Sequence, residues 1–168
     1  MRHEIRFSGF GGQGIVLAAV VLGRAAALYD GKHAVQTQVY GPEARGGASM
    51  SAVIIDDEPI LFPEVTLPDI YVIMSQEGFE RYGAKAPKEA VMILDPGMVE
   101  GRPACRFIEV PATTEARNTL GKVIVANIVM LGAASRFLIV REESLRTLIE
   151  ALFKPRGPAL VETNLTAF

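Results

Sequence analysis

Hydrophobic and polar positions change from a strand-like to a helix-like pattern and back within the first third of the chain. Residues 4–8, 34–40 and 48–55 carry the alternation and β-branched residues that predict three strands. Residues 15–28 are rich in Ala, Val and Leu and contain no proline, so they predict a helix between the first two strands. The order strand, helix, strand, strand is typical of an α/β fold.

The middle of the chain predicts further strands. Residues 69–75 and 90–94 are apolar almost throughout, which is typical of strands covered on both faces, and residues 105–110 predict one more short strand. The acidic, proline-containing run 56–59 suits a hairpin turn or a sheet edge. Ser75 is expected to cap a helix that continues through Arg81.

Helices are expected to dominate the last third. Thr113 or Thr114 can cap a short turn, residues 122–137 predict a helix buried between layers, and Asn127 within it is expected to bond a neighbouring loop. Glu142 begins another helix, and residues 159–168 predict a last one. The prediction is one domain, residues 1–168, with an α/β fold of three layers, α/β/α, around a mostly parallel or mixed sheet.

A first glycine-rich loop, Gly9-Phe10-Gly11-Gly12-Gln13-Gly14, joins the first strand to the first helix. Its G-x-G-x-x-G spacing can expose backbone N–H groups at a helix N-terminus, which makes Gly11, Gly12, Gln13 and Gly14 candidates for binding an anionic group. A dinucleotide site also needs an acidic residue at the end of the second strand, and only Glu43 lies near that place. Close packing of strand and helix is an alternative reason for the glycines.

A second loop carries more glycine, proline and charged residues than an ordinary connection requires. Its candidates for a subunit interface or for the approach to an active site are Tyr40, Gly41, Pro42, Glu43, Arg45, Gly46 and Gly47. A tight turn with a solvated ion pair is the alternative. Because both loops leave strands at their carboxyl ends, we expect them at the same edge of the sheet.

Composition narrows the class of protein. A net charge of −2 with scattered basic residues favours no nucleic-acid surface, and the apolar window 123–134 is too short for a membrane span. The start has no secretory signal, so a soluble, cytoplasmic protein is expected. The single cysteine, Cys105, excludes a disulfide within the chain and a cluster ligated by cysteines of this chain alone, and no metal site is expected. Hydrophobic residues make up 49% of the chain, and the 16 glycines raise its apolar share further. A subunit interface or a large core can bury this share.

Several motifs together resemble a known family. They are the Gly-Phe-Gly-Gly-Gln-Gly loop with its Ala-rich helix, the run Tyr-Gly-Pro-Glu-Ala-Arg-Gly-Gly-Ala-Ser at 40–49, the acidic strand end after it, and Leu67-Pro68-Asp69 before a strand. Over essentially its whole length the chain is similar to the gamma subunit of 2-oxoacid:ferredoxin oxidoreductases. The second loop is most similar to that of 2-oxoglutarate:ferredoxin oxidoreductases (2-oxoglutarate synthases), and pyruvate or a branched-chain 2-oxoacid remains an alternative substrate.

The resemblance implies a non-catalytic gamma subunit, inactive alone, with the fold of the gamma domain of pyruvate:ferredoxin oxidoreductase. It implies alpha and beta subunits that bind thiamine diphosphate and Mg, a ferredoxin-like delta subunit with iron–sulfur clusters, ferredoxin as electron acceptor and coenzyme A as co-substrate. The two loops would then serve assembly or contact coenzyme A. The alternative is a free-standing, monomeric nucleotide- or dinucleotide-binding module that uses residues 9–14 as a phosphate cradle.

Overall fold

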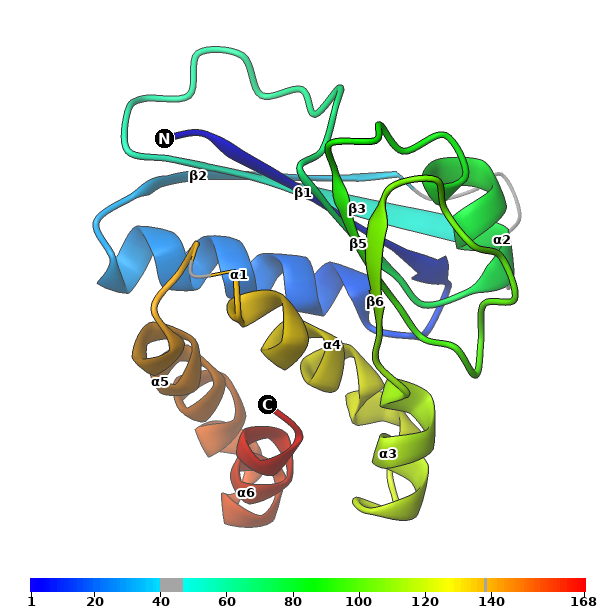
Figure 1. The fold of residues 1–168 in the computed structure, drawn as a ribbon. Helices are drawn as coiled ribbons and strands as arrows, with labels where there is room; N and C mark the ends of the chain where they lie inside the picture. The colour runs from blue at the N-terminus through cyan, green and yellow to red at the C-terminus, as the bar shows by residue number, and fades with distance from the viewer. Residues whose placement is uncertain (40–46, 138) are drawn as a thin grey trace.

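A mixed sheet forms the centre of the computed structural model, which describes residues 1–39, 47–137 and 139–168 (Figure 1). The sheet has six strands in the order β2-β3-β1-β4-β5-β6. These are β1 (His3–Phe10), β2 (His33–Val39), β3 (Ala48–Asp56), β4 (Ile70–Ile73), β5 (Val91–Leu94) and β6 (Arg106–Glu109). Every strand that the sequence predicts is present, with its ends shifted by a few residues.

β3 is the strand that makes the sheet mixed. It pairs antiparallel with both β1 and β2, whereas β1, β4, β5 and β6 are parallel to one another. The interpretation of residues 56–59 as a hairpin turn or sheet edge is wrong, because β3 lies inside the sheet and the next strand, β4, pairs on the far side of β1. The acidic residues there bind cations instead: Asp57 contacts the N-terminal ammonium and Lys32.

Six α-helices accompany the sheet in the described part of the chain: α1 (Ile15–Tyr29), α2 (Gln76–Gly78), α3 (Ala112–Asn118), α4 (Ala126–Ser135), α5 (Glu142–Phe153) and α6 (Pro158–Ala167). A π-helix follows α2 at Phe79–Gly83, and 3₁₀ turns precede α4 at Val123–Val125 and α6 at Lys154–Arg156. The Ser75 cap is confirmed, since its hydroxyl accepts from Gly78 N. The threonine cap of α3 is wrong, because α3 begins at Ala112 and the buried Asp95 carboxylate accepts from Thr113 N.

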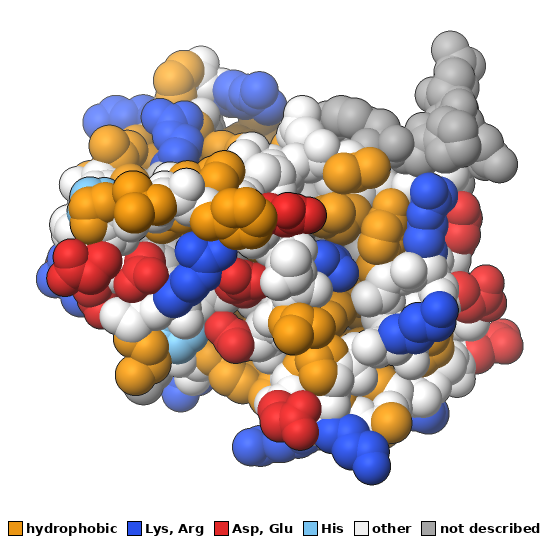
Figure 2. Space-filling view, turned by 90° about the horizontal axis from the view of Figure 1, so that it is seen from above, with side chains coloured by type: hydrophobic (Ala, Val, Ile, Leu, Met, Phe, Trp, Pro, Cys, Tyr) orange, Lys and Arg blue, Asp and Glu red, His pale blue; other side chains and the backbone are white. Residues whose placement is uncertain are grey.

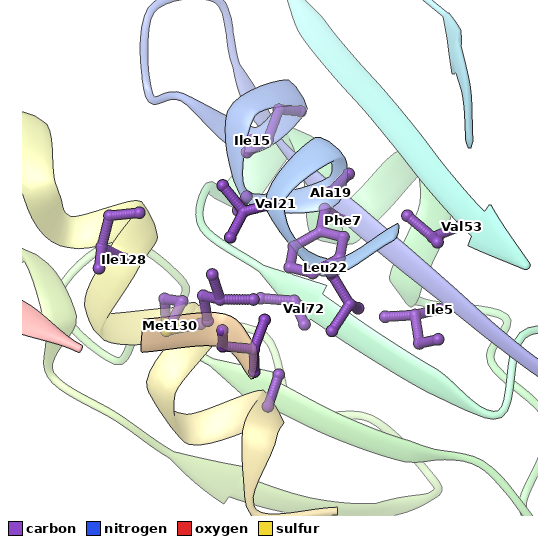
Figure 3. Packing of buried hydrophobic residues seen from close by; sticks show 14 of the residues in the cluster. Ile5, Phe7, Ile15, Ala19, Val21, Leu22, Val53, Val72, Ile128 and Met130 are labelled. Carbon is purple, nitrogen blue, oxygen red and sulfur yellow. The ribbon is translucent and has the colours of Figure 1, made fainter. Parts of the chain in front are cut away.

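Helices α1, α4, α5 and α6 lie on one side of the sheet, where the larger core forms (Figure 1). Figure 3 shows its centre, in which Ile5 and Phe7 of β1 face Leu22 of α1, with Ile128 and Met130 of α4 beyond. A smaller core on the opposite face joins β4 and β5 to the π-helix and to Val99 and Cys105. Both faces of β4 and β5 are therefore covered, as their apolar sequence predicts.

Small residues let α1 lie close against the sheet. Its buried face includes Ala18, Ala19, Ala25 and Ala26, and a β-carbon on Gly23 would already touch Val53 of β3. The connection from β1 to α1, residues 11–14, is short, so the helix starts beside the carboxyl end of this strand. The connection therefore lies at the carboxyl edge of the parallel strands.

Candidate functional site

The first glycine loop has backbone conformations that suit glycine. Gly12 has φ +96° and Gly14 has φ +77°, both in the region that L side chains adopt only at a cost. Gly14 is the N-cap of α1 and offers no side-chain cap, and the first turn of the helix holds no acidic residue. In the described part of the chain, the positive end of the α1 dipole therefore has neither a side-chain cap nor an acidic residue in its first turn.

Two amide side chains hold this loop in place. Gln13 accepts from Phe10 N through Oε1 at 2.9 Å and donates from Nε2 to Met74 O at 2.7 Å, so it joins the ends of β1 and β4. Asn127, at the start of α4, donates from Nδ2 to Gly14 O at 2.9 Å. The expectation that Asn127 bonds a neighbouring loop is confirmed.

Close packing explains two of the glycines. A β-carbon on Gly9 would lie 2.3 Å from Oε1 of Gln13, and one on Gly14 would lie 2.5 Å from Nδ2 of Asn127. Gly12 differs, since a β-carbon there would have nothing within 4 Å. Packing therefore accounts for Gly9 and Gly14, whereas Gly12 is set apart by its backbone angle and its open surroundings.

The loop presents unused N–H groups. The N–H of Gln13 donates to Phe10 O, but those of Gly11, Gly12 and Gly14 donate to no described residue. Gly11 and Gly12 are exposed. Consecutive N–H groups beside a helix N-terminus form an environment that favours an anionic group.

The second loop lies almost wholly outside the described residues, since Tyr40, Gly41, Pro42, Glu43, Arg45 and Gly46 are not described. Gly47 is buried, and Ala48 after it pairs with Phe10 at the end of β1. Glu77 of α2 accepts from Ala48 N at 2.9 Å. The strands that flank both loops thus reach the same edge of the sheet, as the sequence predicts.

A pocket of about 370 Å³ opens beside the first loop, at the carboxyl edge of the parallel strands. Its lining is mostly apolar, with Gln13, Thr113 and Arg117 as polar members: Phe10, Gly12, Gln13, Met74, Met98, Thr113, Arg117, Val123, Ile124 and Ala126. Arg117, at the end of α3, forms no ion pair with any described residue. The pocket can therefore receive an elongated ligand that is partly apolar and partly anionic.

The sheet around this pocket does not have the arrangement of a dinucleotide-binding fold. In that fold the second strand lies next to the first and parallel to it, so an acidic residue at its end reaches the ribose. Here the antiparallel strand β3 separates β2 from β1. The G-x-G-x-x-G spacing is thus present without the neighbouring strand that a dinucleotide site uses.

Comparison with known proteins settles the family. The sequence matches the profile of the family described as pyruvate ferredoxin/flavodoxin oxidoreductase over residues 4–168. The chain belongs to this family. One relative, the 2-oxoglutarate synthase subunit KorC of Methanocaldococcus jannaschii, is 50% identical over 100% of this chain and 91% of its own length.

Solved structures of the family share the fold. The gamma subunit of a keto/oxoacid ferredoxin oxidoreductase from Geobacter sulfurreducens is 40% identical, with a TM-score of 0.83 over 98% of this chain and 93% of that one. A 2-oxoglutarate:ferredoxin oxidoreductase from Magnetococcus marinus is 23% identical, with a TM-score of 0.90, and the match covers 99% of this chain and 30% of that one. The second likeness shows that this fold also occurs within a longer chain.

The pocket in this family member includes residues that sequence reasoning missed. Met98, Thr113, Arg117, Val123 and Ile124 come from three separate segments of the chain. No motif marks them, and only the fold brings them beside Gly12. A weak signal was available for Val123 and Ile124, because an apolar pair at the expected start of a helix, next to Lys122, has no polar face to expose.

The described residues do not fit a metal cluster. Across residues 1–39, 47–137 and 139–168, no group of three or more His, Cys, Asp and Glu side chains could hold a metal ion. Cys105 lies in the smaller core, where burial raises the pKa of its thiol. In the same part of the chain, no helix is long and apolar enough to cross a bilayer.

Proposed function

We propose that this chain is the gamma subunit of a 2-oxoglutarate:ferredoxin oxidoreductase complex. The complex would convert 2-oxoglutarate, coenzyme A and oxidised ferredoxin to succinyl-CoA, carbon dioxide and reduced ferredoxin. The observation that carries the proposal is the end-to-end match, at 50% identity, with a subunit named 2-oxoglutarate synthase. A match of this extent supports the same place in the same kind of complex.

We propose that partner subunits bind the cofactors of the reaction. A thiamine-binding alpha and beta pair would hold thiamine diphosphate and Mg, and a ferredoxin-like delta subunit would hold the iron–sulfur clusters. The single cysteine of this chain supports this division, because such clusters commonly need four ligands of that type. The chain itself would contribute assembly and contact with coenzyme A.

An exposed apolar segment supports the assembly role. In the connection 57–69, Leu61 and Phe62 are 93% and 60% exposed, although Arg2 donates to the carbonyl oxygens of Phe62 and Glu64. The backbone is thus held while its apolar side chains face outward. Figure 2 looks down on this side of the molecule, where hydrophobic side chains gather among charged ones. Apolar side chains presented in this way suit burial against a partner.

The pocket beside the first glycine loop supports contact with coenzyme A. This ligand has phosphate groups, which the N–H groups of Gly11, Gly12 and Gly14 and the guanidinium of Arg117 can bind. It also has a long, weakly polar arm, which suits the apolar lining around Met98 and Ile124. The second loop, residues 40–47, is proposed to contact the partner subunits or the approach to their active site.

Reconstitution tests the proposed function. The partner subunits are purified with and without this chain, and ferredoxin reduction is measured with 2-oxoglutarate, pyruvate and a branched-chain 2-oxoacid. We expect no turnover by the chain alone, little by the partners alone, and activity with 2-oxoglutarate when they are combined. Turnover by the isolated chain would overturn the gamma-subunit assignment, and a preference for pyruvate would overturn the substrate.

The coenzyme A contact is tested separately with Arg117→Gln. In the assembled complex this change should raise the KM for coenzyme A several-fold and leave the KM for 2-oxoglutarate unchanged, because a charge-assisted hydrogen bond to phosphate is lost. Lys85→Gln, an exposed lysine outside the pocket lining, is the control. Equal KM values for coenzyme A in the two variants would remove Arg117 from the site.

A further inference from the structure

A second, smaller cavity lies on the other side of the 3₁₀ turn that leads into α4. This slot has a volume of about 180 Å³ and lies between the start of α1, the start of α4 and the junction of α5 with α6. The side chain of Ile124 lines both the slot and the larger pocket. The first glycine loop also borders both, with Gly12 at the larger pocket and Gly14 at the slot.

The charged residues that line the slot are all cationic. Lys122 and Arg156 line it, and its lining includes no carboxylate. Within the described residues neither cation forms an ion pair. Arg156 is instead placed by the ring of Phe153, with its guanidinium carbon 6.0 Å from the ring centre. The larger groove between α5 and α6 differs, because Glu150 and Glu162 line it beside its cations.

Two buried amides complete the lining. Asn127 and Asn164 are only 2% and 3% exposed, and both border the slot. Each donates one hydrogen bond from Nδ2, to Gly14 O and to Leu160 O respectively, and has no other side-chain bond to a described residue. An amide NH₂ has two protons to donate. Each asparagine therefore has a second N–H beyond the bond that it donates, and both side chains border the slot.

We propose that this slot binds a phosphate monoester, and that in the complex it takes the 3′-phosphate on the ribose of coenzyme A. Lys122 and Arg156 would supply the charge, and Asn127 and Asn164 the directed N–H groups. The assignment of coenzyme A rests on the proposed function. Since Ile124 borders both cavities, one extended ligand can place its 3′-phosphate in the slot and its remaining phosphates and arm along the glycine loop and the larger pocket. The slot then distinguishes coenzyme A from analogues without this phosphate.

The test compares coenzyme A with dephospho-coenzyme A, which lacks only the 3′-phosphate. The variants Lys122→Gln and Arg156→Gln, singly and together, are assembled with the partner subunits, and the KM for each ligand is measured along with the KM for 2-oxoglutarate. Both side chains are exposed, so the fold should persist, and circular dichroism checks this. Lys154→Gln is the matched control, since Lys154 is an exposed cation two residues from Arg156 that lines the other groove.

The double variant should raise the KM for coenzyme A by about tenfold or more and leave that for dephospho-coenzyme A unchanged, because the charge-assisted hydrogen bonds to the 3′-phosphate are lost. Equal losses for both ligands would overturn the phosphate assignment. If the double variant behaves as wild type while Arg117→Gln weakens coenzyme A, the slot proposal fails and the proposed contact stands. If neither change alters the KM for coenzyme A, both fail.

Discussion

At the residue scale, Gly12 is the position where the candidate site depends most directly on one backbone angle. Its φ of +96° disfavours any L side chain, yet a β-carbon there would meet no atom within 4 Å. The cost of a substitution therefore comes from the backbone and from what approaches the loop. Gly31 offers the same combination far from the pocket, with φ +67° and nothing within 4 Å.

This pair separates folding from function. Gly12→Ala and Gly31→Ala should each lower the free energy of unfolding by about 1–2 kcal/mol, since both place a side chain at positive φ. Gly12→Ala alone should also raise the KM for coenzyme A, because the new β-carbon occupies the open space beside the loop. Denaturant unfolding and steady-state kinetics of the assembled complex measure the two effects. Equal KM values in the two variants would show that coenzyme A does not occupy the space beside Gly12.

The sequence predicted the first glycine loop better than the side-chain hydrogen bonds that hold it. The glycine spacing and the adjoining helix marked residues 9–14, and the polar Asn127 in an apolar helix correctly indicated a bond to a neighbouring loop. The second bond of Gln13 could not be predicted, because its partner, Met74 O, is a backbone atom at the end of another strand. Contacts of this kind depend on the sheet order, which local pattern does not determine.

At the element scale, Asp30 joins the end of α1 to the start of α5. Its carboxylate, on a nearly buried side chain, accepts from Arg141 N and Arg141 Nε, both at 2.8 Å, and from the Ser144 hydroxyl. Burial acts to raise the pKa of Asp30, but the hydrogen bonds from Ser144 and Arg141 outweigh it and the pKa is lowered. The charged form is therefore favoured in the folded protein, also by the positive end of the α5 dipole.

Asp30→Asn should lower the free energy of unfolding at neutral pH by about 1–2 kcal/mol, since the charge-assisted bonds are lost. Because the folded pKa is lowered, the contribution of Asp30 is present above the ordinary aspartate pKa of ~3.9 and lost as the pH falls through the folded value. Urea unfolding at pH 7 and at pH 3 measures this, and the difference from wild type should shrink at pH 3. Asp57→Asn, an exposed carboxylate, should change stability much less. A difference independent of pH would exclude ionisation of Asp30 as the cause.

The elements themselves were largely predictable, and their arrangement was not. Long apolar runs identified β4, β5 and α4 because covered strands and helices have no polar face. The sequence has no comparable signal for the position of β3 between β1 and β2. An alternation of polar and apolar residues looks the same whether the strand pairs parallel or antiparallel with its neighbours. The slot residues Lys122 and Arg156 were missed for the same reason. They line one cavity only because α6 packs beside α4.

At the scale of the whole molecule, we propose that the second loop contributes to assembly. Arg45 lies outside the described residues, so its role stays a prediction from the sequence. An arginine that pairs with a carboxylate of a partner subunit would leave that charge unpaired when truncated, at a cost of ~2–5 kcal/mol. Arg45→Ala should therefore leave the chain folded and weaken the complex at least about tenfold. Titration calorimetry against the partner subunits measures this, and an unchanged dissociation constant with unchanged coenzyme A kinetics would favour a solvated turn.

The connection 57–69 gives a second test of assembly, argued from exposure. Leu61 and Phe62 project from a backbone that Arg2 and Arg6 hold through its carbonyl groups, so ordering this segment on binding should cost little entropy.

Leu28 on α1 is a matched control, because it is 59% exposed where Phe62 is 60% exposed, and it lies in a different element. Phe62→Ser and Leu28→Ser should both leave the free energy of unfolding nearly unchanged, since neither side chain is buried in the chain alone. Phe62→Ser should weaken the complex by about tenfold, as expected for an aromatic side chain buried at an interface, and Leu28→Ser should not. Mass photometry over a dilution series of the assembled complex measures both dissociation constants. If Leu28→Ser weakens the complex and Phe62→Ser does not, the partner covers the helical layer rather than this connection.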